Sequence, residues 1–166
     1  MKIFCDIDST VNNHWVRIQR NTTIGKNGSV NISDKAFARE EMMQDEPLAG
    51  SKDAIKKLKE EHEIHFLTAR GAIKDGFNIT KDWLNYHDFE YDSLMLVEKT
   101  MQKVELMSGY RDSLLIDDLS RMQHIGASYI HLYRDVIKEL EKNNINFILF
   151  KGSWVDVLDK IYGVER

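Results

Sequence analysis

The chain has 166 residues, of which 42% are apolar and 30% are charged, and its 23 Lys and Arg against 27 Asp and Glu give a formal net charge of −4. This length allows one compact domain with a buried core and is short for two, and the composition excludes wholesale disorder. The mildly acidic balance excludes a general binder of nucleic acid or of anionic membranes, because phosphate contacts need clustered Lys and Arg.

The sequence contains one cysteine, Cys5, which excludes an intrachain disulfide framework and a cysteine-rich zinc site. The apolar run before Asp6 is too short for a signal peptide or a membrane anchor. No window approaches the roughly 18 uninterrupted apolar residues of a bilayer-spanning helix. We therefore expect a soluble, cytoplasmic protein without a membrane partner, and the sequence leaves its oligomeric state undetermined.

Five short apolar runs predict the strands of an α/β fold. They occupy residues 2–7, 64–68, 93–97, 113–116 and 146–150. Continuous apolar runs of this length are typical of strands that are covered on both faces, as in a parallel sheet. The expected fold class is therefore a Rossmann-like α/β domain with a mainly parallel sheet flanked by helices.

Amphipathic segments between these runs predict the helices. They cover residues 51–61, a segment capped by Thr80, and residues 100–108, 134–143 and 153–162. In the last of these, apolar residues recur at helical spacing from Trp154 to Tyr162, which indicates core packing. An additional helical stretch, roughly 128–143, is expected before the final strand.

Residues 12–48 interrupt this alternation. Helical pieces are predicted around His14–Arg20 and Asp34–Met43, and Asn27-Gly28 between them is a strong turn signal for a short hairpin. Because the segment follows the first strand directly, we expect it to form a small cap inserted into a single domain of residues 1–166. The cap would cover the carboxyl end of the sheet, where α/β folds bind ligands.

Polar side chains follow three of the predicted strands. They are Asp6 and Asp8 after the first, Thr68 at the end of the second, and Asp117 and Asp118 after the fourth. Strand ends converge in a doubly wound sheet, so the four carboxylates should gather within several ångströms. A like-charge pair 4 Å apart costs about 4 kcal/mol at an effective dielectric of 20, which a bound cation relieves. A hard, oxygen-seeking ion suits such a cluster, and Mg²⁺ is the cofactor expected.

The order of these residues resembles that of the haloacid dehalogenase-like (HAD) phosphohydrolases. The segment FCDIDSTV is similar to their first motif, IHFLTAR to the second, MQKVELM to the third and LLIDDLSRM to the fourth. These motifs run from residue 3 to about 122, so the resemblance covers most of the chain. It implies a HAD-type Rossmann-like fold and Mg²⁺-dependent hydrolysis of phosphomonoesters.

The resemblance implies a role for each motif residue. Asp6 would be the nucleophile that forms an aspartyl-phosphate. Asp8 would protonate the leaving oxygen and then activate water, so a raised pKa is expected for it. Thr68 would donate a hydrogen bond to a phosphoryl oxygen, and Lys103 would neutralise charge on the transferred group. Lys99 competes for the lysine role, and we favour Lys103 because it opens the helix that leads into the fourth strand.

The resemblance also implies a set of magnesium ligands. They are Asp6, the backbone carbonyl of Asp8, and Asp117, with Asp118 as an orienting group or a ligand through water. The candidate substrate contacts are Thr10, Ala69, Arg70, Trp15 and Arg17. Trp15 and Arg17 would contact a base and a second phosphate, although cap packing and surface charge are favoured for both. Arg70 would either reach the substrate or form a salt bridge at the start of a helix.

Two longer segments indicate a substrate class. Residues 46–70 and 80–96 are similar to segments of 5'(3')-deoxyribonucleotidases and of the phosphatase half of phage-type polynucleotide kinases. The expected substrate is a nucleoside monophosphate or another small phosphorylated metabolite, and a nucleic-acid 3' end is the alternative. The sequence LSRMQ after Asp118 lacks the Arg-Pro common at that place in nucleotidases, which leaves the substrate undetermined.

Two alternatives come from other classes of protein. A receiver-like phospho-acceptor module also combines an acidic pair, a Thr, a Lys and Mg²⁺. Its phosphorylated Asp follows about the third of five strands, where this sequence has Glu98 and Lys99. A catalytically inactive Mg²⁺-binding protein is the other alternative, and the filled catalytic positions count against it.

Overall fold

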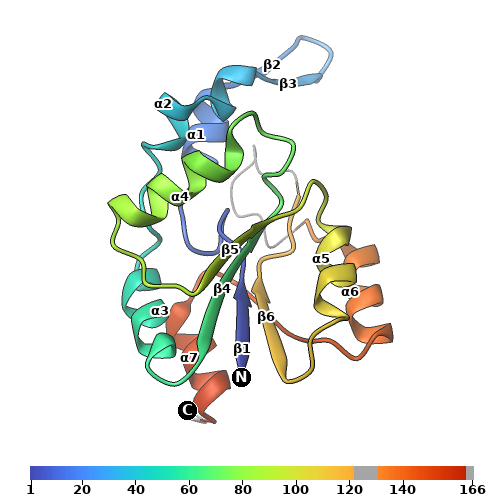
Figure 1. The fold of residues 1–166 in the computed structure, drawn as a ribbon. Coiled ribbons are helices and arrows are strands. Elements are labelled where there is room, and N and C mark those ends of the chain that lie inside the picture. Colours follow the sequence, from blue (N-terminus) through green and yellow to red (C-terminus); the bar gives the residue numbers. More distant parts are fainter. Residues whose placement is uncertain (122–130, 164–166) are drawn as a thin grey trace.

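The computed structural model describes residues 1–121 and 131–163, and a five-stranded parallel sheet forms its centre (Figure 1). The strands lie in the order β5-β4-β1-β6-β7. Their bounds are β1 Lys2–Cys5, β4 Glu63–Thr68, β5 Ser93–Leu96, β6 Ser113–Asp117 and β7 Asn146–Leu149. The chain runs from β1 outward to β5 and then crosses to β6 on the other side of β1. The carboxyl ends of β1 and β6 therefore flank the switch point where such sheets bind ligands.

Helices cover both faces of this sheet (Figure 1). One layer contains α3 (Ser51–Lys59), α4 (Gly76–Tyr86) and α7 (Trp154–Tyr162), and the other contains α5 (Met101–Met107) and α6 (Arg134–Lys142). The central strands divide their side chains between the two layers by alternation. Ile3 and Cys5 pack with the α3 side, whereas Phe4 packs with the α5 side. This two-sided burial explains the continuous apolar runs in the sequence.

The segment between β1 and α3 lies above the carboxyl edge of the sheet (Figure 1). It contains α1 (Trp15–Arg20), an antiparallel hairpin of β2 (Thr22–Ile24) and β3 (Val30–Ile32), a 3-10 helix η1 (Asp34–Phe37) and α2 (Arg39–Met42). Its two stems pair with each other, because Asn12 bridges to Pro47 and the Leu48 N–H donates to the Val11 carbonyl. The segment therefore leaves and rejoins the chain at one place.

The fold class predicted from the sequence is confirmed, and the hairpin at Asn27-Gly28 is present. The prediction that Thr80 caps a helix is wrong, because α4 begins at Gly76 and Thr80 lies one turn inside it. The Thr80 hydroxyl donates to the Gly76 carbonyl instead. The helix predicted over Asp34–Met43 is broken at Ala38, whose backbone is extended.

The helix predicted before the final strand begins at Arg134, and residues 128–130 of that stretch lie outside the described residues. In the described part of the chain, no helix has the length and apolar character that crossing a membrane requires.

Candidate active site

Three carboxylates meet at the sheet edge between β1 and β6. Oxygens of Asp6, Asp117 and Asp118 all lie within 4.8 Å of one another, and each residue is at most 5% exposed. Asp6 follows β1 and Asp117 ends β6, so the pairing of these neighbouring parallel strands brings the two acids side by side. We call these three residues, together with Lys103, the carboxylate cluster.

Lys103 supplies the positive charge of the carboxylate cluster. Its Nζ atom lies 2.7 Å from Asp6 Oδ1 and 2.7 Å from Asp117 Oδ2, and the residue is 2% exposed. Lys103 reaches this position from the buried face of α5. Lys99 is exposed on the wall of the adjoining cavity. The structure therefore places Lys103, and not Lys99, against the proposed nucleophile.

Burial and mutual repulsion make this cluster hold protons strongly. Burial, followed by the charge of Asp117, raises the pKa of Asp6 to about 7 against the opposing charge of Lys103. Burial and the charges of Asp117 and Asp6 also raise the pKa of Asp118 well above its ordinary value. Burial lowers the pKa of Lys103, but the charges of Asp117 and Asp6 outweigh that effect and raise it. If all three acids lost their protons, they would carry more negative charge than the one lysine can offset.

Thr10 contacts two acids of the carboxylate cluster through its hydroxyl group. It is fully buried, and its Oγ1 accepts a hydrogen bond from the Asp118 N–H at 3.2 Å. The same hydroxyl lies 3.4 Å from Asp118 Oδ1 and 3.5 Å from Asp6 Oδ2. Ser120 also donates a hydrogen bond to Asp118. Thr10, predicted to contact substrate, is instead placed where it fixes two carboxylates.

The Asp8 carboxylate does not join the cluster. Ser9 has a left-handed backbone (φ 63°), which ends the extended run after Asp8. Arg70 makes a bidentate pair of hydrogen bonds to Asp8, from Nε to Oδ2 at 2.8 Å and from Nη2 to Oδ1 at 2.5 Å. The expected gathering of four carboxylates is therefore wrong, because the fourth has an arginine partner of its own.

The expectation of a raised pKa for Asp8 is also wrong for this structure. Burial raises the pKa of Asp8, but the charge and hydrogen bonds of Arg70 outweigh that effect and hold it well below its usual range. The charges of His14 and Arg17 act in the same direction. Asp8 is therefore held as a carboxylate.

A second buried arginine joins the cap to this ion pair. Arg17 Nε lies 3.0 Å from Asp45 Oδ1, and Arg17 Nη2 lies 3.1 Å from Asp45 Oδ2 and 3.8 Å from Asp8 Oδ1. Arg17 Nη1 donates to the Ala36 carbonyl. Burial raises the pKa of Asp45 to about 6, although its hydrogen bonds to Arg17 oppose this. We call Asp8, Asp45, Arg17 and Arg70 the arginine network.

Sequence reasoning missed Asp45 altogether. The residue lies in the acidic segment before Pro47, with no strand end or motif beside it. Its backbone carbonyl accepts a hydrogen bond from Trp83 Nε1 at 2.8 Å, and its carboxylate accepts one from Asn12 at 2.9 Å. These contacts come from distant parts of the chain, so no local pattern could have identified them.

Thr68 ends β4 beside the cluster and is 1% exposed. Its Oγ1 is buried and has no hydrogen-bond partner among the residues that the structure describes. A buried hydroxyl without a hydrogen-bond partner costs on the order of 1–3 kcal/mol, so such groups are rare in folded proteins. A ligand oxygen beside Thr68 would supply the missing partner.

These groups adjoin a cavity of about 600 Å³. The residues of the earlier predictions that line it are Asp6, Asp8, Arg17, Thr68, Ala69, Arg70, Lys99, Lys103, Asp117 and Asp118. Trp15 is half-buried on α1 and is not among the lining residues, so the structure does not bring it to the site. Arg17 reaches the cavity wall, but it is buried and paired with Asp45 and the Ala36 carbonyl. The expectation that it packs within the cap is confirmed, and the expectation of a surface charge is wrong for it.

The donor set of the carboxylate cluster fits a hard divalent cation. It offers three buried carboxylates within a few ångströms and contains no sulfur or imidazole. When all three acids are ionised, their charge exceeds that of Lys103 by two. Burial and then the charge of Asp117 raise the pKa of Asp6, and a nearby cation would oppose the second of these effects.

No protein-family model matches the sequence, and no functionally curated protein matches it. Among solved structures, a hydrolase of the haloacid dehalogenase-like family from Streptococcus pneumoniae aligns with a TM-score of 0.58. The alignment covers 96% of this chain and 97% of that chain, at 9% sequence identity. The two chains therefore share a fold, a mainly parallel sheet flanked by helices on both faces. At 9% identity this likeness concerns the fold and not the chemistry.

Proposed function

We propose that the protein is a Mg²⁺-dependent phosphomonoesterase that acts through an aspartyl-phosphate on Asp6. The observation that carries the proposal is the carboxylate cluster, which is bridged by Lys103 and lies beside the unpartnered Thr68 hydroxyl on the wall of a cavity. A nucleophile, a cationic clamp and a hydrogen-bond donor for a phosphoryl oxygen converge there. The fold places the cluster at the switch point of the sheet, where ligands bind.

Asp6 is the nucleophile because its carboxylate faces the cavity while one of its oxygens is held by Lys103. Attack on phosphorus forms the bond between an Asp6 oxygen and phosphorus and breaks the bond to the leaving oxygen. Water then attacks the acyl phosphate and restores Asp6. Lys103 offsets the charge of the transferred group, and the Thr68 hydroxyl donates to one of its oxygens.

Asp8 serves the leaving group, since it also lines the cavity and follows Asp6 by two residues. To carry a proton, Asp8 has to lose part of its bonding to Arg70. Phosphoryl oxygens are strong acceptors for a guanidinium, so a bound substrate would compete with Asp8 for Arg70. Asp6, the backbone carbonyl of Asp8 and Asp117 would hold Mg²⁺, with Asp118 as an orienting group or a ligand through water. The ion would supply screening between the anionic nucleophile and the phosphate.

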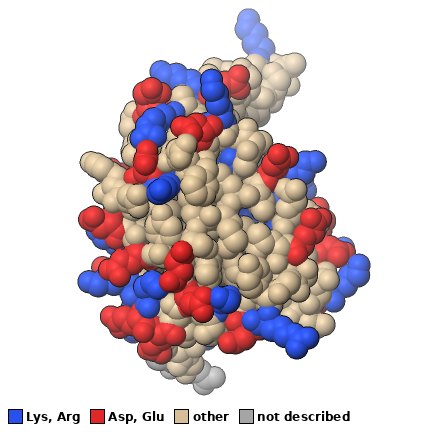
Figure 2. Space-filling view, viewed as in Figure 1, with Lys and Arg blue, Asp and Glu red and all other residues tan. Residues whose placement is uncertain are grey.

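The expected substrate is a small phosphomonoester, with a nucleoside monophosphate first and a polynucleotide 3' end as the alternative. Figure 2 shows positive and negative side chains interspersed over the viewed face, without a basic track along which a polynucleotide would run. The receiver alternative is weakened because β5, the third strand of the main sheet, ends at Leu96 and is followed by Val97 and Glu98. We expect the protein to act in the cytoplasm.

The test is hydrolysis of p-nitrophenyl phosphate with Mg²⁺ by the wild-type chain and by Asp6→Asn. We expect multiple turnovers by the wild type and a loss of at least about 10³-fold in kcat for the variant, because no acyl phosphate can form. Borohydride trapping followed by peptide mass spectrometry should mark Asp6 in the wild type. Slow, single-turnover labelling would favour the receiver, and inertness toward a broad panel of phosphoesters would favour an inactive Mg²⁺-binding protein.

A further inference from the structure

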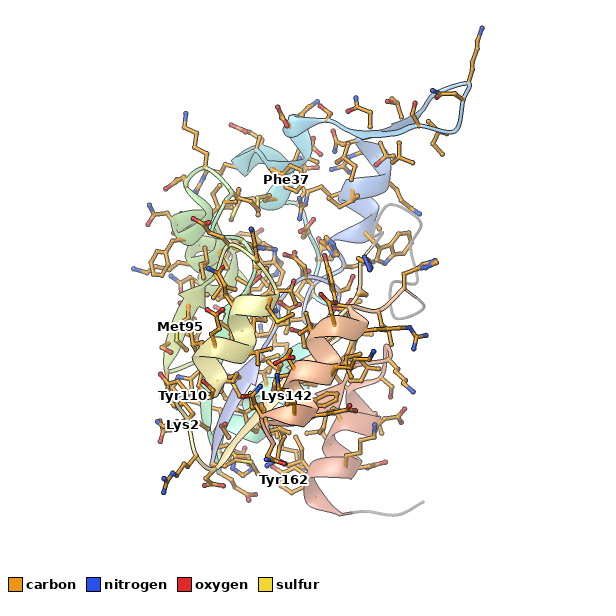
Figure 3. The ribbon with its side chains drawn as sticks, turned by 90° about the vertical axis from the view of Figure 1, so that its right-hand side faces the viewer. Lys2, Phe37, Met95, Tyr110, Lys142 and Tyr162 are labelled. Carbon is orange, nitrogen blue, oxygen red and sulfur yellow. The ribbon has the colours of Figure 1, made fainter. Side chains whose placement is uncertain are left out.

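The cavity extends from the carboxylate cluster to an apolar surface of the cap. Ile18 of α1, Ile32 of β3 and Phe37 of η1 all line it. Figure 3 labels Phe37 in the cap, above α5 and α6. Ile73, which lies between β4 and α4, lines the same cavity from the core. We call Ile18, Ile32 and Phe37 the apolar cap face.

Phe37 is exposed enough to contact a ligand in the cavity. The residue is 37% exposed, whereas Ile18, which lines the same cavity, is 2% exposed. A phenyl ring that is half-exposed on a cavity wall has a flat surface available for another ring, and offset stacking is the favoured geometry for such a pair. The chain orders this position locally, because Ser33 caps η1 and the Ser33 N–H donates to the Asn21 carbonyl at the base of the hairpin.

The cap offers no spare charge at this surface. Its two basic residues that line the cavity are His14 and Arg17. Arg17 uses Nε and both Nη atoms on Asp45 and on the Ala36 carbonyl, and His14 Nδ1 lies 3.2 Å from Ser9 Oγ. A second phosphate held by the cap would therefore have to displace Asp45 from Arg17, since the exposed cations that line the cavity, Lys99 and Arg121, lie outside the cap. The apolar cap face instead suits an uncharged, planar group.

We infer that the apolar cap face selects phosphomonoesters whose leaving group carries an aromatic ring, with Phe37 as the specificity-determining residue. This inference rests on the proposed phosphatase activity. The phosphate would lie at the carboxylate cluster, and the ring would pack against Phe37 and Ile32. The volume of about 600 Å³ lies within the range of pockets that enclose a whole small-molecule ligand, so it accommodates both parts. A nucleobase and a simple aryl group share this chemistry.

The test compares substrates that differ only in the ring. Adenosine 5'-monophosphate and ribose 5-phosphate share the phosphate and the sugar, and phenyl phosphate paired with glycerol phosphate tests a ring without a nucleoside. We expect kcat/KM to be at least about tenfold higher for adenosine 5'-monophosphate than for ribose 5-phosphate. Phe37→Ala should lower kcat/KM for the nucleotide about tenfold and change it less than about twofold for ribose 5-phosphate.

Phe77→Ala is the matched control, because Phe77 is a 48% exposed phenylalanine on α4 that does not line the cavity. It should leave both substrates unchanged, and Phe37→Tyr should retain the preference. A preference confined to phenyl phosphate would assign the surface to simple aryl groups. Equal kcat/KM for the matched substrates, or an equal loss on both in Phe37→Ala, would overturn the inference while hydrolysis itself upholds the proposed function. Inertness toward all four substrates and p-nitrophenyl phosphate would overturn both.

Discussion

Two buried groups of charges adjoin one cavity, and they are built in opposite ways. The carboxylate cluster sets three acids against one lysine, whereas the arginine network sets two acids against two arginines. The arginine network is electrically complete, and it joins Arg17 and Asp45 of the cap to Asp8 and Arg70 near the sheet. The carboxylate cluster lacks the charge that would complete it. Two groups of similar burial therefore differ in charge balance: one joins the cap to the core through paired charges, and the other is the site at which we propose that a cation binds.

Removing one cation from the arginine network should have the largest effect on stability. Arg17→Met leaves Asp8 and Asp45 buried near each other without the charge between them. We expect the free energy of unfolding to fall by about 3–5 kcal/mol, as measured by urea unfolding. Lys26→Met, an exposed lysine in the hairpin loop, is the matched control and should change it by less than about 0.5 kcal/mol. A small effect of Arg17→Met would show that the network does not hold the cap.

Adding Mg²⁺ should stabilise the protein through the carboxylate cluster. At a Mg²⁺ concentration about 100 times its dissociation constant, the free energy of unfolding should rise by about 2.7 kcal/mol. Asp117→Asn should remove most of this gain, because Asp117 is one of the three converging carboxylates. Thermal unfolding with Mg²⁺ and with EDTA measures both. An equal gain in wild type and Asp117→Asn would place the ion elsewhere.

The sequence was sufficient to predict the carboxylate cluster because its acids lie at strand ends. Asp6 and Asp117 are separated by more than a hundred residues, but parallel strands bring their ends to one edge and the motif order selects them. The same reasoning separated Lys103 from Lys99 through helix placement. The order of motifs and predicted strands along the chain was therefore enough to predict which residues form the cluster.

The arginine network could not be predicted in this way. Asp45 has no periodic or motif context, and its partners Arg17, Asn12 and Trp83 are fixed only when the cap folds onto the core. The expectation for Asp8 was wrong for the same reason, since its ionisation depends on a direct contact with Arg70, which lies 62 residues further along the chain. Thr80 has the side chain of a capping residue but lies inside α4, where it accepts a hydrogen bond from Arg70 at 3.1 Å.

Neutralising one acid of the carboxylate cluster should raise the free energy of unfolding, by less than Arg17→Met lowers it. Asp118→Asn keeps the shape of the side chain and removes one of three like charges. In EDTA at pH 7 we expect the free energy of unfolding to rise by about 1 kcal/mol, since repulsion and burial penalise the charged form. The comparison is chemical unfolding of wild type and variant without metal. If Asp118→Asn instead lowered the free energy of unfolding by several kcal/mol, the charges of the three acids would already be offset in the absence of metal.

Breaking a surface ion pair should have the smallest effect on the free energy of unfolding, and that effect should depend on pH. Lys59 Nζ lies 2.7 Å from Asp92 Oδ1, and this hydrogen bond lowers the pKa of Asp92. A lowered folded-state pKa means that the contribution is present above the unfolded value of about 3.9 and is lost as the pH falls through the folded value. Asp92→Asn should cost less than about 1 kcal/mol at pH 7. The difference from wild type should shrink below about pH 4, and a constant difference would contradict this origin.

Isothermal titration calorimetry with Mg²⁺ tests most directly whether the carboxylate cluster is a cation site. The account predicts one Mg²⁺ bound per chain in the wild type and a binding heat that is lost in Asp117→Asn, while Asp92→Asn binds as the wild type does. Absence of binding in the wild type, or unchanged affinity in Asp117→Asn, would contradict it.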